Sequence, residues 1–323
     1  FRAFEVGENR IFYSLAALKG VGDAAVEHIV AMRGEKPFKN LADFCERVDP
    51  KIVGKRVFES LIMAGALDCF GHDRAAMMMG LASLAQQNAM SGQHDIFGAS
   101  LGAQSQALNL PATDPWLAAD RLHREFQVVG FYLSAHPLDE YKAALQKMRV
   151  QNWAEFSAAV KRGAAAGRLA GTVTTKQERK TRTGNKMGVV QFSDTSGQYE
   201  AVLFSEGLAQ YRDLLEPGRS VVITVSAEDR PEGVNLRIQT VQSLEDEASR
   251  IQKALRIFVR DDRPASAIQS QLTQRGDSQV SIIVIKDEAQ GEVEIELPNR
   301  YRVSPQIASA MRAVPGVVEV ELV

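Results

Sequence analysis

The chain has 323 residues, of which 45% are hydrophobic and 24% are charged, so it can bury apolar cores and extended disorder is not expected. Its 38 basic and 40 acidic residues leave a net charge of −2, so any basic surface must be local. No apolar run reaches the roughly 18 to 20 residues of a membrane span. The two cysteines, Cys45 and Cys69, lack the spacing of a metal site or a disulfide framework. We expect a cytoplasmic protein with no membrane partner.

The first half of the chain has a helical pattern. From residue 11 to about residue 90, apolar residues recur three and four positions apart, which predicts amphipathic helices. A stretch rich in Gln, Ser, Gly and Ala follows, which is typical of a linker. The patterns predict a helical domain (1–90), a linker (91–115) and a helical connection (116–160).

Five short strand-like runs follow, with a helical piece after the third. The runs are 169–175, 187–193, 199–204, 220–226 and 234–241, and the helical piece is 208–215. This order is that of a five-stranded OB barrel, whereas a seven-stranded sandwich would need two more strands. We therefore expect an OB domain over residues 161–245.

The last region, residues 254–323, alternates strand and helix patterns in the order βαββαβ. That is the order of a ferredoxin-like split βαβ unit. From Leu255 onward it carries 8 basic and 10 acidic residues, so it is a poor DNA binder and a plausible protein-binding module. The predicted fold class is α+β multidomain: a helical domain, an OB barrel and a small βαββαβ domain.

A glycine-rich turn stands near the start of the helical domain, with the sequence Lys19-Gly20-Val21-Gly22. We expect it between two amphipathic helices, the first running from about residue 11 to residue 18. Such a turn points backbone N–H groups at the start of the second helix, where the dipole favours an anion. This helix-hairpin-helix pattern predicts contact with duplex-DNA phosphates through Lys19, Gly20, Val21 and Gly22. The alternative is an ordinary turn whose glycines only cap helices, and Asp23 disfavours an anion there.

Helix-hairpin-helix units also occur in DNA glycosylases, in which a hairpin lysine and a later aspartate do chemistry. Lys19 and Asp43 have roughly that spacing. However, Asp43 follows Asn40 closely, and one of these two residues is more simply explained as the start of a helix. We therefore favour DNA binding over glycosylase chemistry.

The barrel region contains a local excess of positive charge. Between residues 161 and 186 there are eight basic residues and one acid. OB folds bind oligonucleotides with strands 2 and 3 and the loop between strands 1 and 2, where cations meet phosphates and aromatics stack on bases. Phe192 and Tyr199 lie on the two candidate strands, where either could stack on a base or fill the core. The predicted single-stranded-DNA residues are Lys176, Arg179, Lys180, Arg182, Lys186, Phe192 and Tyr199.

Four stretches, residues 17–22, 38–44, 59–68 and 125–138, resemble the C-terminal part of the bacterial replicative DNA polymerase III alpha subunit. The resemblance covers essentially the whole chain and is weakest in the last domain. It implies, in this order, a duplex-binding helix-hairpin-helix domain, a sliding-clamp motif, an OB domain for single-stranded template and a domain that binds the clamp-loader tau subunit.

A short segment in the linker, Gln93-His94-Asp95-Ile96-Phe97, has two adjacent bulky apolar residues with no helix face or strand alternation to bury them. Such residues indicate a partner site if they are exposed. The segment resembles the family's clamp motif, Gln-x-x-Leu-Phe with Asp often third, with Ile96 in place of Leu. The resemblance implies that Gln93, Asp95, Ile96 and Phe97 bind the clamp. The alternative is that Ile96 and Phe97 pack onto the neighbouring domain.

The resemblance also implies what this chain lacks. The family's polymerase centre is a set of palm carboxylates that hold magnesium ions, and it lies upstream of the region resembled. This chain has no Asp-x-Asp pair and no P-loop pattern, so we expect no cofactor and no polymerase activity in it alone. The rival readings are a DNA-repair enzyme with similar domains, such as a glycosylase or ligase, and a scaffold of protein-binding modules.

Overall fold

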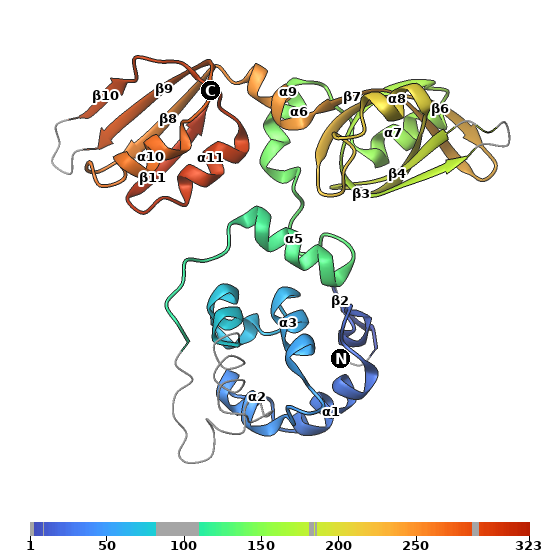
Figure 1. Ribbon diagram of the computed structural model, residues 1–323, viewed down its shortest axis with the longest axis vertical. Helices are drawn as coiled ribbons and strands as arrows, with labels where there is room; N and C mark the ends of the chain where they lie inside the picture. Colours follow the sequence, from blue (N-terminus) through green and yellow to red (C-terminus); the bar gives the residue numbers. More distant parts are fainter. Residues whose placement is uncertain (1–2, 9, 82–109, 181–183, 185, 286–290) are drawn as a thin grey trace. The chain divides into compact units, whose positions relative to one another are not determined.

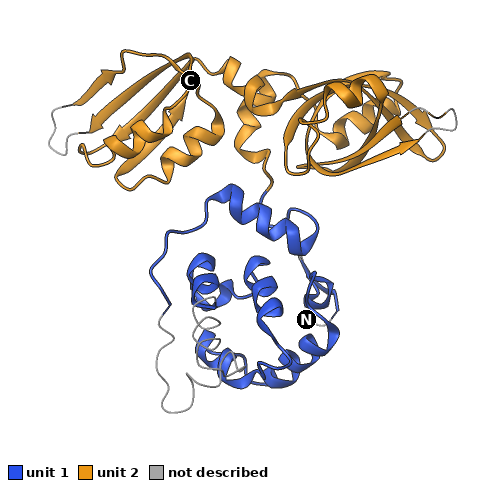
Figure 2. Cartoon of the chain, in the orientation of Figure 1, with its two compact units in different colours: residues 1–135 blue, residues 136–323 orange. Residues whose placement is uncertain are grey.

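Figure 1 shows the computed structural model, which describes residues 3–8, 10–81, 110–180, 184, 186–285 and 291–323. The chain divides into two compact units, residues 1–135 and 136–323 (Figure 2). Within the described residues, no helix combines the length and the apolar character needed to cross a bilayer.

The first unit is mainly helical. It opens with a hairpin of β1 (Glu5–Gly7) and β2 (Arg10–Phe12), followed by the 3-10 helix η1 (Leu15–Ala17). The remaining elements are α1 (Asp23–Arg33), α2 (Leu41–Arg47), α3 (Lys55–Met63), η2 (Asp68–Phe70), a helical stretch at 74–81, and α5 (Ala118–Val129). Their apolar faces share one core, whose most buried members include Val26, Leu41, Leu61, Ile62 and Met77.

The expectation of a helix over residues 11–18, before the glycine-rich turn, is wrong. Residues 10–12 form a strand, and only three residues of 3-10 helix precede the turn. The four- and three-residue spacing of Ile11, Leu15 and Leu18 does not mark one buried face, because Ile11 is 72% exposed and Leu15 is only partly buried. The helical domain itself is confirmed by α1, α2 and α3.

The predicted OB barrel is confirmed. Its strands are β3 (Ala166–Lys180), β4 (Lys186–Asp194), β5 (Gly197–Phe204), β6 (Ser220–Arg230) and β7 (Gly233–Ser243), and α8 (Ser205–Gln210) follows the third. They close in the order β3-β4-β5-β7-β6, with β6 pairing back to β3. Alternate residues of each strand fill the interior, among them Leu169, Val190, Phe192, Leu203 and Ile223.

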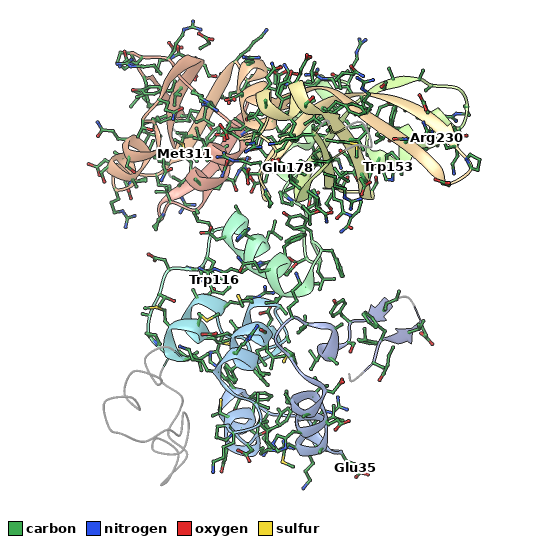
Figure 3. All side chains as sticks on the ribbon, turned by 45° about the vertical axis from the view of Figure 1, so that its right-hand side comes forward. Glu35, Trp116, Trp153, Glu178, Arg230 and Met311 are labelled. Atoms are coloured by element: carbon green, nitrogen blue, oxygen red, sulfur yellow. The ribbon has the colours of Figure 1, made fainter. Side chains whose placement is uncertain are left out.

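The helical segment expected over residues 116–160 is divided between the two units. Val128 and Val129 of α5 belong to the core of the first unit. The elements η3 (Asp139–Tyr141) and α6 (Lys142–Lys147) pack instead with α9 (Leu244–Ile251) on the outside of the barrel, around Leu138, Tyr141 and Leu244. The helix α7 (Trp153–Val160) contributes Phe156 and Trp153 to the barrel core, and Figure 3 labels Trp153.

The last domain has the predicted order βαββαβ. Its elements are β8 (Ala254–Val259), α10 (Ala265–Gln271), β9 (Arg275–Ile285), β10 (Glu292–Glu296), α11 (Pro305–Arg312) and β11 (Val317–Leu322). The sheet order is β10-β9-β8-β11, and β8 and β9 are parallel neighbours. The βαβ unit is therefore not split, contrary to the expectation. The reason is that β9 carries fully buried Val280 and Ile283, which suit a central strand, whereas the Glu-rich β10 suits an edge.

Candidate nucleic-acid interface

The hairpin at residues 18–22 leads directly into α1. Leu18 and Val21 are buried and anchor it, whereas Lys19 is exposed. Gly20 has φ +86°, a backbone conformation that other residues rarely adopt. Gly22 is the N-cap of α1 and offers no side-chain cap, so no N-cap side chain occupies the first amides of this helix. The amides of Lys19 and Val21 already donate to the Val128 and Leu18 carbonyls, so the hairpin presents the Lys19 side chain beside the uncapped, positive end of the α1 dipole.

A second cation lies beside this hairpin. The Ser60 hydroxyl of α3 donates a hydrogen bond to the Lys19 carbonyl (2.9 Å), and the Lys19 amide donates to the Val128 carbonyl (2.9 Å). A Cβ built at Gly20 would lie only 3.3 Å from Arg56 Nε. The exposed Arg56 therefore borders the hairpin from α3. Sequence reasoning missed Arg56 because no local pattern connects α3 to a turn so much earlier in the chain.

Asp43 belongs to the start of α2. Asn40 is the N-cap, and its side-chain oxygen accepts from the Asp43 amide (2.8 Å). The Asp43 carboxylate accepts from the Lys39 amide (2.8 Å) and from Arg47 (3.2 Å). The hydrogen bond from the Lys39 amide lowers the pKa of Asp43, whereas a general base works best with a pKa near the working pH. These contacts confirm the helix-start role and disfavour glycosylase chemistry.

The basic residues of the barrel differ in their environments. The ammonium of Lys176 is held by the Glu216 carboxylate and by the Arg212 carbonyl, and its side chain is only 12% exposed, so it is unsuited to meet a phosphate. Arg179, Lys180 and Lys186 are exposed, with Lys180 opposite Lys186 across β3 and β4. Arg182 lies outside the described residues.

The assignment of Phe192 and Tyr199 as base-stacking residues is wrong. Both side chains point into the barrel, where they are 0% and 5% exposed. Their rings stack on each other with centroids 5.3 Å apart, and Trp153 also stacks on Tyr199 at the same distance. Burial raises the pKa of Tyr199 well above its usual value. A Cβ at Gly171 would lie 2.7 Å from the Tyr199 hydroxyl, so this stack fills the interior closely and leaves no ring face for a base.

The outer face of the same strands carries a different aromatic. Phe204, the last residue of β5, is 40% exposed, and the Arg237 guanidinium of β7 lies 4.7 Å from its ring centroid. Tyr199 and Phe204 are five positions apart, and an odd separation places two residues on opposite faces of a strand. Sequence reasoning could have used this parity, but which of the two faces outward depends on closure of the barrel.

The pairing of three neighbouring strands places Arg179, Met187 and Phe204 in one row. Arg179 of β3 lies opposite Met187 of β4, and Met187 lies opposite Phe204 of β5. Directly opposed side chains share a face, so the row continues onto Arg237 through its contact with Phe204. We call this row, Arg179, Met187, Phe204 and Arg237, the outer strip. It combines two guanidinium groups with an aromatic and an apolar side chain, which suits phosphates and bases together.

The clamp segment, Gln93, Asp95, Ile96 and Phe97, lies outside the described residues. In the last domain, Glu292, Glu294 and Glu296 are all exposed on β10. A group of three or more His, Cys, Asp or Glu side chains arranged for a metal ion is absent from the described part of the chain.

Two family models match the chain. The model described as helix-hairpin-helix motif matches residues 1–77, and the model described as OB-fold nucleic acid binding domain matches residues 168–244. The first contains the hairpin with Lys19 and Arg56, and the second contains the whole outer strip.

Curated relatives match nearly the whole chain. The DNA polymerase III subunit alpha of Caulobacter vibrioides is 33% identical over 98% of this chain, and that of Escherichia coli K12 is 28% identical over 98%. The subunit of Pseudomonas aeruginosa is 35% identical over 81%. The chain spans 28%, 28% and 24% of the length of these relatives, respectively. With its helix-hairpin-helix and OB domains, the chain is homologous to the C-terminal region of the bacterial DNA polymerase III alpha subunit.

Proposed function

We propose that this chain holds DNA and accessory proteins for a replicative DNA polymerase and performs no nucleotidyl transfer by itself. The observation that carries the proposal is the outer strip, which places Arg179, Phe204 and Arg237 on one face of a barrel within a polymerase homologue. Single-stranded template would lie along this strip, with phosphates on the guanidinium groups and a base on Phe204. In a full-length alpha subunit, palm carboxylates outside the region matched by this chain would hold the magnesium ions for polymerisation.

Duplex DNA would be held by the hairpin of the first unit. Lys19 and Arg56 are both exposed beside Gly20 and would contact phosphates without reading bases. Asp23, exposed in the first turn of α1, opposes an anion at that helix start, so we assign most of the attraction to the two cations.

The duplex assignment can be tested by salt dependence. Lys19→Ala and Arg56→Ala should each lower the slope of log affinity against log salt by about one unit, equally on all duplex sequences. Fluorescence anisotropy with a labelled duplex measures this slope. Lys36→Ala is the matched control, because the exposed Lys36 follows the opposite end of α1, an 11-residue helix roughly 16 Å long. An unchanged slope in both test variants would refute phosphate contact by this hairpin.

The linker segment would bind the sliding clamp. Gln93 and Asp95 would hydrogen-bond at the pocket rim, and Ile96 with Phe97 would fill an apolar pocket on the clamp. Ile96→Ala combined with Phe97→Ala should abolish clamp binding, as measured by surface plasmon resonance, and leave duplex affinity unchanged. Clamp affinity that survives this double change would contradict the assignment.

The last domain would bind the clamp-loader tau subunit. Its excess of acidic residues makes it a poor DNA binder, and an exposed acidic strand at the edge of its sheet supports a protein partner.

A further inference from the structure

The strand β10 is an uncovered edge of the last domain. Figure 1 shows it at one end of the sheet, and β9 is its only partner among the described strands. All five of its residues are exposed. One long side of its backbone therefore has N–H and C=O groups that a further strand could pair with.

The apolar side chains of β10 extend the core face without being covered. Val293 and Ile295 lie opposite Val284 and Ile282 of β9, which pack on the core. However, Val293 and Ile295 are 43% and 49% exposed and belong to no buried cluster of the described residues. The face beneath the helices thus ends in an open apolar shelf, formed by Val293 and Ile295.

The other face of β10 is acidic. Glu292, Glu294 and Glu296 alternate with the shelf residues and so share the opposite face. Arg256 of β8 approaches Glu294 (3.9 Å), but it also pairs with Glu321 of β11 (3.2 Å). One guanidinium thus serves two carboxylates, and the edge keeps a negative charge.

This charge decides which kind of strand can pair with β10. A second copy would place glutamates opposite glutamates, and directly opposed like charges destabilise a strand pair. A strand with Lys or Arg at those positions would gain charge pairs, and its alternate apolar residues would cover the shelf. Main-chain hydrogen bonds would supply affinity, and the alternating side chains would supply specificity.

We propose that β10 is the docking edge for an extended, basic and apolar segment of a protein partner, which adds a fifth strand to this sheet. Its Lys or Arg side chains lie over Glu292, Glu294 and Glu296, and its apolar side chains lie on Val293 and Ile295. This inference rests on the proposal that the last domain binds a protein, and it adds the mode of binding and the chemistry of the segment.

The test uses the full chain and two blocked peptides of equal length, one alternating lysine with valine and the other glutamate with valine. We expect the lysine peptide to bind at least tenfold tighter and to slow amide hydrogen exchange at residues 292–296. Glu292→Lys, Glu294→Lys and Glu296→Lys together should reverse the preference. Val293→Thr with Ile295→Thr, which keeps the β-branched shape, should weaken the lysine peptide several-fold.

The matched control is the triple change Glu228→Lys, Asp229→Lys and Glu232→Lys, which alters net charge equally but lies on the barrel. It should leave the preference unchanged. The proposal is overturned if neither peptide binds, if both triple variants behave alike, or if residues 292–296 gain no protection. Tau binding that persists without peptide binding would refute this docking mode and leave the proposed function standing.

Discussion

Among single residues, Glu125 of α5 is a buried carboxylate that connects separate segments of the first unit. This carboxylate is 1% exposed and accepts hydrogen bonds from the amides of Leu133 (3.1 Å) and Ser134 (2.8 Å). It also pairs with the buried Arg74 guanidinium (3.5 Å), which is held in turn by Asp68. Burial opposes the charge of Arg74, but Asp68 and Glu125 outweigh it and hold the pKa of Arg74 above its usual value.

Glu125→Ala should therefore lower the free energy of unfolding of the first unit by about 3 kcal/mol, because it leaves two amides without an acceptor and removes one of the two carboxylates that pair with the buried Arg74. Urea unfolding followed by Trp116 fluorescence measures the loss, and Trp116 packs against this core. Glu125→Gln keeps the shape and one acceptor oxygen, so its loss should be smaller. Equal losses in the two variants would contradict the hydrogen-bond argument.

Among the elements, β5 shows how one strand serves core and surface at once. Tyr199, Ala201 and Leu203 fill the barrel, while Phe204 lies on the outside beneath Arg237. Replacing an aromatic residue on the outer face should therefore affect DNA binding, whereas replacing one on the inner face should affect the stability of the barrel.

Phe204→Ala should weaken single-stranded DNA binding by about 1 to 3 kcal/mol, the contribution of one stacked base, and leave the fold intact. Tyr199→Ala should instead destabilise the barrel by about 3 to 5 kcal/mol through a cavity. Anisotropy with labelled oligonucleotides and urea unfolding separate the two effects. The control is Phe131→Ala, since Phe131 is a similarly exposed aromatic of the first unit. Single-strand affinity unaffected by Phe204→Ala would exclude the outer strip as the binding face.

In the whole molecule, the buried clusters fall on separate sets of residues. Among the described residues, the first unit has one cluster, and the second has three: the barrel core, the packing outside the barrel and the core of the last domain. The chain has two tryptophans, and Figure 3 labels one in each unit, Trp116 and Trp153. Each tryptophan packs against the core of its own unit.

Unfolding should consequently occur in two transitions, which Trp116→Phe and Trp153→Phe would isolate by leaving one tryptophan each. Adding Glu125→Ala should lower the urea midpoint seen by Trp116 by about 1.5 M and leave that seen by Trp153 in place. A single shared midpoint that moves with Glu125→Ala for both probes would show that the units unfold cooperatively.

Local patterns predicted much of the fold. Turn residues and period-two alternation identified five barrel strands and the helix after the third, because a closed barrel makes each strand amphipathic. The helical spacing predicted α1, α2 and α3, because a helix that packs on a core is apolar on one face and polar on the other. The spacing failed at Ile11, because residues 10–12 pair with β1 as a strand and leave the Ile11 side chain exposed instead of on a helix face that packs on the core.

By itself, the sequence determined the element types, the hairpin with Lys19 and the basic excess of the barrel, since each of these is a property of neighbouring residues. Only the tertiary structure decided that Phe192 and Tyr199 point inward, that Lys176 is held by Glu216, and that Arg56 borders Gly20. It also decided that β9 separates β8 from β10. Each of these depends on which distant segments meet, and burial of apolar surface across the whole unit selects those contacts.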